Sequence, residues 1–238
     1  MLDKTQIGGL SDKARRIIRS YLADTDLWTM IYLLGGPPRV GKSTISRAIP
    51  KKYGISVVST DSLGSVLESV LDPEAEPGLF VFTRFNEMPA ADRINLMVEN
   101  TPELINYTIE ESRAVWKAVK PFILKEKEEC RDVLIEGVAV LPELVRQITN
   151  IDYRVVFIGN QGNENKKNIK QGADSNEHDW MRYASDEYIG AFATFVVRMS
   201  AYIEQEARKY GFSYIEMDGR PFQDIAGAVV ESLGLEAR

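Results

Sequence analysis

The residues best suited to chemistry form a glycine-rich segment near the start of the chain. Residues 36–43 read Gly-Pro-Pro-Arg-Val-Gly-Lys-Ser and satisfy the pattern G-x-x-x-x-G-K-[ST]. They follow an apolar run at 30–34 and open a helical pattern, which is the strand–loop–helix context that the motif requires. Backbone N–H groups of such a loop wrap a β-phosphate, and the start of the next helix adds partial positive charge. The segment therefore predicts a site for the phosphates of a nucleotide.

Two residues of this P-loop have specific expected roles. Lys42 is expected to bridge the β- and γ-phosphates of ATP, and Ser43 to offer its hydroxyl to Mg²⁺. A dinucleotide site is the other interpretation of a glycine loop, but the pattern G-x-G-x-x-G is absent here. No motif that reads the base separates ATP from GTP. The residues expected to bind the nucleotide are Gly36, Pro37, Pro38, Arg39, Val40, Gly41, Lys42, Ser43 and Thr44.

Acidic residues follow two other apolar runs, and ligands of open α/β sheets bind beyond the carboxyl ends of the strands. Asp61 follows the run at 55–59, where a carboxylate could accept a substrate hydroxyl proton or hold a Mg²⁺-bound water. The alternative for this segment is an Asp or Ser cap of the helix expected over 62–71. Glu136 closes the run at 132–136 and fits an outer-shell Mg²⁺ ligand, with Gly137 leaving space. Its weight comes from its combination with the P-loop, because many strands end in Glu.

A lid is expected over about residues 160–182. The stretch 159–179 is rich in Asn, Gln, Lys and Glu and is interpreted as an exposed, mobile segment. A mobile cover that excludes water and brings a cation to the γ-phosphate would protect ATP from futile hydrolysis. Arg182 is the candidate cation, and the alternative is a solvated loop with ordinary basic residues. The rivals of Arg182 are Lys166, Lys167 and Lys170.

Five short apolar runs must position these residues. They span 30–34, 55–59, 133–135, 153–158 and 214–217, and each is followed by turn residues and a helical pattern. Continuous apolar character is typical of strands buried on both faces, so the runs predict an α/β fold with a five-stranded parallel sheet flanked by helices in three layers. One long helix is expected from Thr101, kinked or divided at Pro121, and another over 184–210.

Composition bounds the partners. The chain has 238 residues, with 29 Lys+Arg against 35 Asp+Glu, a formal charge of −6. This mild acidity argues against nucleic-acid binding, and the apolar runs are far shorter than the ~20 residues that span a membrane. One cysteine, Cys130, and one histidine, His178, exclude an internal disulfide and make a His-rich metal site implausible. We expect a cytoplasmic protein with small-molecule partners, and its oligomeric state stays open.

Four segments resemble a known family. They read GGPPRVGKST, STDSLGSVL, VLIEGVAVLPELV and RYASDEYIGAFATFVVRMSAYIEQEARKYGF. They are similar to P-loop small-molecule kinases related to nucleoside monophosphate kinases, and most of all to 2-phosphoglycerate kinase-like proteins. The resemblance implies transfer of the ATP γ-phosphate to a small acceptor, with Asp61 as a substrate or catalytic residue, Glu136 near the metal, and residues 219–222 near adenine. It also implies a kinase-like domain over 29–238, preceded by a helical extension over 1–28.

Two departures leave the acceptor open. Basic residues that the family places after the Asp are missing, and Ala139 stands where the family tends to have a histidine. An acceptor as anionic as phosphoglycerate would need cations from elsewhere, for which Arg84 and Arg93 are available. A sugar or a nucleoside fits equally well. The alternative functions are an ATP-binding switch with slow hydrolysis and an antibiotic-modifying kinase that differs only in its acceptor.

Overall fold

The sheet confirms all five predicted strands. The structure, a computed structural model, describes residues 29–235, so the extension predicted over 1–28 lies outside the described residues. The parallel strands lie in the order β2-β3-β1-β4-β5, with the first strand in the centre. The strands are β1 (Ile31–Gly35), β2 (Ser56–Ser59), β3 (Val133–Gly137), β4 (Tyr153–Gly159) and β5 (Ser213–Glu216).

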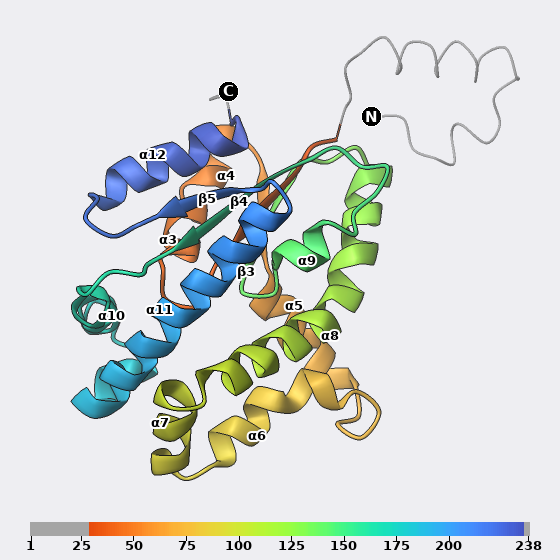
Figure 1. The fold of residues 1–238 in the computed structure, drawn as a ribbon. Helices are drawn as coiled ribbons and strands as arrows, with labels where there is room; N and C mark the ends of the chain where they lie inside the picture. The colour runs from red at the N-terminus through yellow and green to blue at the C-terminus, as the bar shows by residue number, and fades with distance from the viewer. Residues whose placement is uncertain (1–28, 236–238) are drawn as a thin grey trace, which may run out of the picture.

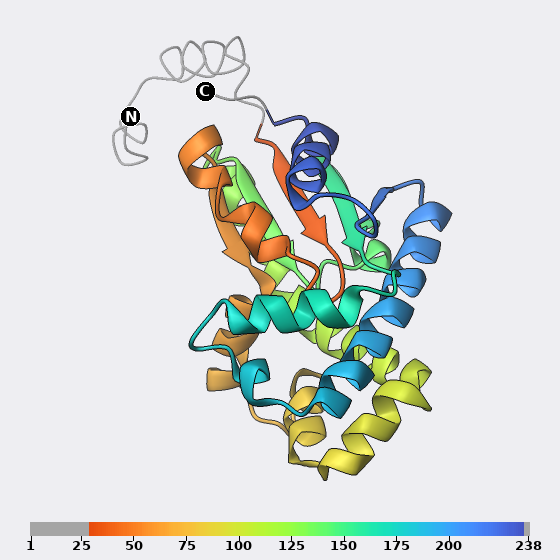
Figure 2. The same cartoon turned by 90° about the vertical axis from the view of Figure 1, so that its left-hand side faces the viewer.

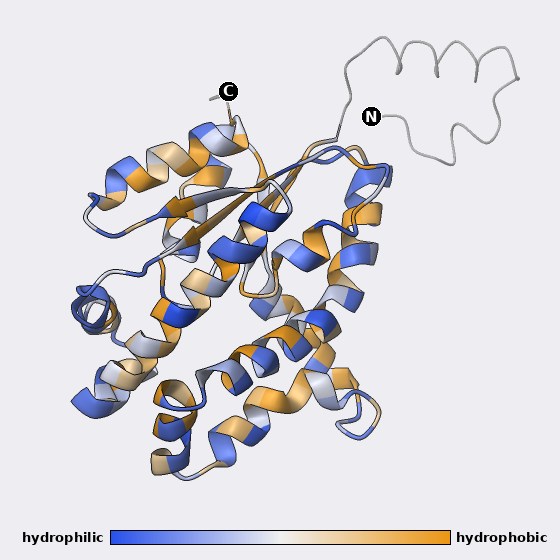
Figure 3. Ribbon diagram, in the orientation of Figure 1, coloured by the Kyte–Doolittle hydropathy of each residue, from blue (hydrophilic) through white to orange (hydrophobic). Residues whose placement is uncertain are grey.

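Helices cover both faces of the sheet, which gives the predicted three layers. One face carries α3 (Lys42–Ser46), α4 (Ile49–Tyr53) and α12 (Phe222–Leu233). The other face carries α9 (Pro142–Val145), α11 (Asp186–Lys209) and the second half of α8 (Thr101–Glu128) (Figures 1 and 2). Every residue of β1 and β3 is buried, because these strands have neighbours on both sides and helices on both faces. Figure 3 shows the corresponding hydrophobic colour along the strands.

A second group of helices lies beyond the carboxyl ends of the strands. The long connection from β2 to β3 supplies α5 (Thr60–Val70), the 3-10 helix η1 (Pro77–Phe80), α6 (Val81–Glu87), α7 (Ala90–Val98) and the first half of α8. After β4 follow α10 (Asn165–Asp174) and the 3-10 helix η2 (Trp180–Tyr183). Figure 2 shows α10 crossing just beyond the strand ends. This end of the sheet is therefore surrounded by helices from two different connections.

Pro121 does not divide α8, which runs unbroken from Thr101 to Glu128. A proline inside a helix removes one backbone hydrogen bond and crowds the preceding turn. Residues on both sides of Pro121, among them Trp116, Val119 and Ile123, are buried in the same core. Tertiary packing of this apolar face outweighs the local cost and keeps the helix in one piece.

The polar segment predicted to be exposed contains a helix with a buried face. Asn165, Ile169 and Ala173 are spaced four residues apart on α10, and all three are buried. Two apolar residues among ten are too weak a pattern to predict a helix from sequence, but this spacing puts them on one face. Figure 3 shows the rest of α10 as hydrophilic. Within residues 29–235, no helix is both long and apolar enough to cross a membrane.

Gly137, at the end of β3, allows a close approach between β3 and the start of α5. Its φ is +148°, and a Cβ atom built there would lie 1.8 Å from the hydroxyl oxygen of Thr60. Thr60 is itself buried, with 1% of its surface exposed. Asp61, the residue after Thr60, can therefore lie next to the end of β3 only because residue 137 has no side chain.

We expect Gly137→Ala to lower the free energy of unfolding by roughly 2 kcal/mol or more, because it adds both backbone strain and a steric overlap. Gly227→Ala is the matched control, since Gly227 lies inside α12 with no atom within 4 Å of a built Cβ. That change should stabilise the protein by about 0.5–1 kcal/mol. Urea unfolding of both variants measures the difference, and equal midpoints would refute it.

Candidate active site

The P-loop joins β1 to α3 and lies against the end of β4. Gly36 has a φ of +152°, and a Cβ built there would lie 2.3 Å from the carbonyl oxygen of Ile158. The loop can therefore follow this path only with glycine at position 36. The helix that follows is short: α3 ends at Ser46, and α4 begins at Ile49 with Pro50 in its first turn, because a proline cannot donate the hydrogen bond that would continue α3.

Lys42 extends back into the loop. Its Nζ donates hydrogen bonds to the carbonyl oxygens of Gly36 (3.0 Å) and Pro37 (2.7 Å), and only 6% of its surface is exposed. Burial lowers the pKa of Lys42 to about 8, while the nearby carboxylates of Asp61 and Glu136 act in the opposite direction. The ammonium is thus held inside the loop by uncharged acceptors, which phosphate oxygens can replace with stronger, charge-assisted bonds.

Ser43 and Glu136 meet as the sequence predicts. The Ser43 hydroxyl donates to Oε1 of Glu136 at 3.0 Å, and Glu136 is buried with 4% of its surface exposed. The pairing of β1 with β3 puts Leu34 opposite Glu136, so the carboxylate lies next to the start of the P-loop. Burial raises the pKa of Glu136, and Lys42 and the Ser43 hydrogen bond oppose this rise.

These two side chains fit Mg²⁺. Hydroxyl and carboxylate oxygens are the ligands that Mg²⁺ prefers, and nucleotide sites hold the ion by one or two protein groups, waters and phosphates. Within residues 29–235, no three His, Cys, Asp or Glu side chains gather closely enough to bind a metal by themselves. His178, the single histidine of the sequence, is exposed, and its backbone N–H donates to the Asn176 side chain.

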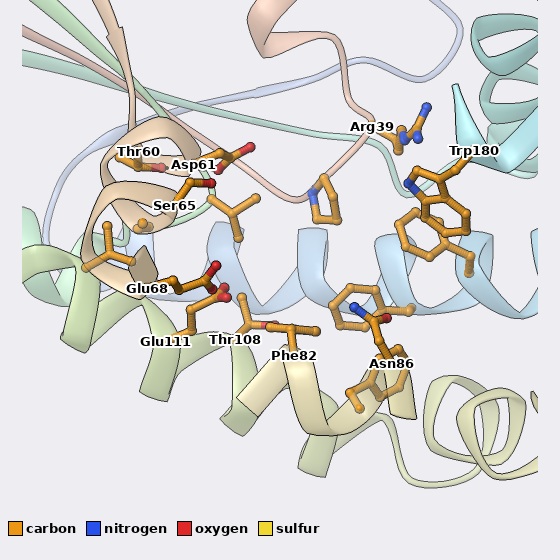
Figure 4. A pocket seen from close by; sticks show the side chains of 18 of the residues that line it. Arg39, Thr60, Asp61, Ser65, Glu68, Phe82, Asn86, Thr108, Glu111 and Trp180 are labelled. Carbon is orange, nitrogen blue, oxygen red and sulfur yellow. Dashed lines mark hydrogen bonds between the residues drawn. The ribbon is translucent and has the colours of Figure 1, made fainter. Parts of the chain in front are cut away.

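The cap of α5 is Ser59 and not Asp61, so the Asp61 side chain does not serve as a helix cap. Ser59 is the N-cap of α5, and its hydroxyl oxygen accepts a hydrogen bond from the backbone N–H of Asp61 (3.2 Å). The Asp61 carboxylate is exposed, and within residues 29–235 it accepts a single hydrogen bond, a long one from the Thr60 hydroxyl at 3.5 Å. In Figure 4 it extends from α5 toward the pocket.

A cavity of about 400 Å³ lies between the P-loop and the helices beyond the sheet (Figure 4). The P-loop, α5, α6, α8, the loop after β3, η2 and α11 all contribute to its wall. Arg39 of the P-loop lines it, and forms an ion pair with Asp179 in which Nη2 lies 2.7 Å from Oδ1. The guanidinium lies 5.9 Å from the ring centre of Trp180. The P-loop arginine thus connects the loop to the segment that precedes η2.

The other predicted cations lie elsewhere. Arg182 is exposed, and Arg84 is exposed on α6; neither lines the cavity. Arg93 lies 5.4 Å from the ring centre of Tyr188 and lines a neighbouring cavity of about 310 Å³. Lys166 pairs with Asp186 at 2.6 Å, and together with Lys167 and Lys170 it lines a separate surface pocket. The roles proposed for these residues stay predictions.

Two carboxylates of the cavity were missed by the sequence reading. Glu68 lies seven residues after Asp61 on α5, so the two share a helix face, and Glu111 comes from α8. Burial raises the pKa of Glu111 to about 8, with further contributions from Asp61 and Glu68. Helical spacing from Asp61 could have indicated Glu68. No local pattern could have indicated Glu111, since the crossing of α5 and α8 brings it there.

The region expected near adenine lies beside the P-loop. A Cβ built on Gly41 would be 2.9 Å from the ring of Phe222 and 3.8 Å from the side chain of Met217. Phe222 is 41% exposed, which leaves part of its ring open to a ligand. The position near adenine that the resemblance implies for residues 219–222 stays a prediction.

The strand order, and the phosphate loop after the central strand, define a P-loop nucleotide-binding fold. No protein-family model matches the chain. It is similar to the 2-phosphoglycerate kinases of Pyrococcus horikoshii and Pyrococcus furiosus, with 26% identity over 191 and 190 residues, which confirms the predicted resemblance. The match covers 79% of this chain and 59% of each relative, so the chain spans about three fifths of their length.

A solved structure of shikimate kinase from Acinetobacter baumannii, in complex with shikimate, has a TM-score of 0.43 and 15% identity. The alignment covers 89% of this chain and 95% of that one. The fold assignment therefore rests on the strand order and loop geometry of this chain.

The raised pKa of Glu111 makes the stability of the fold depend on pH. The folded protein keeps the Glu111 proton up to about pH 8, whereas an unfolded glutamate releases it near 4.5, so unfolding releases a proton between these values. Stability at this position falls as the pH rises through that window. We expect Glu111→Gln to raise the melting temperature at pH 9 by several degrees relative to pH 5, at about 2–4 °C per kcal/mol. Calorimetry of the ligand-free protein tests this. Glu74→Gln, at an exposed position, is the control, and a gain independent of pH would contradict it.

Proposed function

We propose that the protein transfers the γ-phosphoryl group of Mg·ATP to a hydroxyl of a small molecule. One observation carries this proposal: Lys42, the Ser43–Glu136 pair and Asp61 come from three neighbouring strand ends and lie close together, and Asp61 lines the adjoining cavity. The similarity to 2-phosphoglycerate kinases supports the same class of reaction.

The residues divide the work. Bound Mg²⁺ would neutralise charge on the β- and γ-phosphates, held by the Ser43 hydroxyl and, through water, by Glu136. The Lys42 ammonium exchanges the carbonyls of Gly36 and Pro37 for phosphate oxygens. Asp61 orients the acceptor hydroxyl and takes its proton as the new bond to phosphorus forms. Such positioning and charge stabilisation supply most of the catalysis in phosphoryl transfer.

Closure would involve the segment before α11. Arg39 already holds Asp179, and Arg182 follows three residues later on η2. We propose that nucleotide binding draws η2 inward so that Arg182 reaches the transferring group, while the cavity loses water. The sequence leaves a 2-phosphoglycerate-like molecule, a sugar and a nucleoside open as acceptors. The first of these would need Arg84 or Arg93 to move toward the cavity, because neither lines it.

The test is Asp61→Asn, with an acceptor first found by screening small alcohols and phosphorylated metabolites for ADP release above the ATP-only background. We expect kcat for the acceptor to fall by about 10²–10⁴-fold, because the general base is lost. The affinity for Mg·ATP should stay within about twofold, measured by calorimetry.

Lys42→Met is the matched control for the nucleotide side, and it should weaken Mg·ATP binding itself. If the Asp61→Asn variant phosphorylates the acceptor undiminished, Asp61 is not the base. If no acceptor stimulates turnover in the wild-type protein, the ATP-binding switch with slow hydrolysis takes the place of the kinase.

A further inference from the structure

The cavity beside the P-loop has an unusual charge balance for a phosphate-transfer site. Three carboxylates line it, those of Asp61, Glu68 and Glu111. Among the lining residues Arg39 is the single Lys or Arg, and its charge is already matched by Asp179. Because burial raises the pKa of Glu111 to about 8, its carboxyl group is neutral near neutral pH, and the negative charge of the acceptor side comes from Asp61 and Glu68. A bound cation would favour the charged form of Glu111 as well.

The carboxylates lie at one end of the cavity. Figure 4 shows the side chains of Glu68 and Glu111 extending toward one another from α5 and α8, with Asp61 on the side nearer the P-loop. Arg39 and Trp180 lie at the opposite end (Figure 4). Asp61 and Glu68 lie on the same face of α5, seven residues apart, so both carboxylates line this cavity.

Glu68 and Glu111 have no protein partner. Within residues 29–235, neither side chain has a hydrogen bond or an ion pair. Glu111 is partly buried beside two other carboxylates, which is costly for an acidic group, and burial raises its pKa. The described residues offer no metal-binding group of three that would explain this arrangement. A ligand that donates charged hydrogen bonds would satisfy both carboxylates.

Aromatic side chains form much of the remaining wall. Six rings line the cavity and give it a large apolar surface. Such surfaces hold apolar bodies and also favour cations near ring faces. The rings are those of Phe82, Phe85, Trp180, Tyr188, Phe192 and Phe195.

We infer that the acceptor is an amine-bearing alcohol with an apolar body, whose ammonium group lies between Glu68 and Glu111 and whose hydroxyl lies at Asp61. This inference rests on the proposed function. In the transfer, the acceptor oxygen forms a bond to the γ-phosphorus, the bond from that phosphorus to the ADP oxygen breaks, and the hydroxyl proton passes to Asp61. The ammonium group takes no part in the reaction and serves to hold the acceptor.

The same geometry disfavours an acceptor with a phosphate or carboxylate group. Such a group would meet three carboxylates on the wall and the phosphates of the nucleotide, with no unpaired lining cation to receive it. Desolvating an anion without a partner is expensive.

The experiment compares matched acceptors by ADP release. One set is glucosamine, glucose and glucose 6-phosphate; the other is phenylalaninol, 3-phenylpropan-1-ol and phenyllactate. We expect the amine member of at least one set to have a kcat/KM at least tenfold above its neutral and anionic counterparts. The Glu68→Gln/Glu111→Gln double variant should lose that preference while keeping its affinity for Mg·ATP. Glu74→Gln, exposed and outside the cavity, should keep both.

Preference for an anionic acceptor, no preference within either set, or an amine preference that survives in the double variant would overturn the inference. If no acceptor is phosphorylated, calorimetry with the Mg·ADP-loaded protein separates the two proposals. Amine binding that depends on Glu68 and Glu111 would then retain the pocket assignment while the transferase function fails. Absence of such binding overturns the pocket assignment as well.

Discussion

Burial of the Lys42 ammonium is the constraint on which the rest of the site depends. A buried cation is costly unless charged and polar groups surround it, and here the loop carbonyls lie in contact while Glu136 and Asp61 lie nearby. Glu136 lies at the end of β3, and Asp61 is the second residue after β2. They can reach Lys42 only because β1 is central and β3 lies between β1 and β2. The strand order is thus the structural condition for holding this lysine.

Strands and helices divide the site between them. The strand ends fix the groups that we propose to bind phosphate, and the strand register leaves these groups little freedom: Gly35 lies opposite Gly137, and Leu34 opposite Glu136. The helices of the β2–β3 connection, with α11, form most of the wall of the cavity that we propose for the acceptor. Arg39 links the two parts, because it belongs to the P-loop and holds Asp179 just before η2. The P-loop and the segment before η2 are therefore joined directly by this ion pair.

The sequence predicted the parts of the protein that follow local rules. The five apolar runs form the five strands of the sheet. The motif, together with the rule that ligands bind at strand ends, predicted that Ser43 and Glu136 lie at one site, and they are hydrogen-bonded. Prediction failed where tertiary packing decides. Pro121 is tolerated inside α8 because both flanks share one core, and α10 forms on only two apolar residues. The Arg39–Asp179 pair joins residues 140 positions apart, which no local pattern can show.

The carboxylates of the proposed acceptor cavity show the same difference between what local sequence predicts and what tertiary packing decides. Glu68 follows from helical spacing once Asp61 is assigned, but Glu111 depends on how α8 crosses α5. The net charge of −6 says nothing of this placement. Burial raises the pKa of Glu111, because its charged form is poorly solvated between α5 and α8. Phosphates bound at the P-loop would add negative charge beside Asp61. An anionic acceptor would then be repelled both by the phosphates and by the carboxylates, whereas a cation with an apolar body would be attracted to both and held by Glu68 and Glu111, the carboxylates farther from the loop.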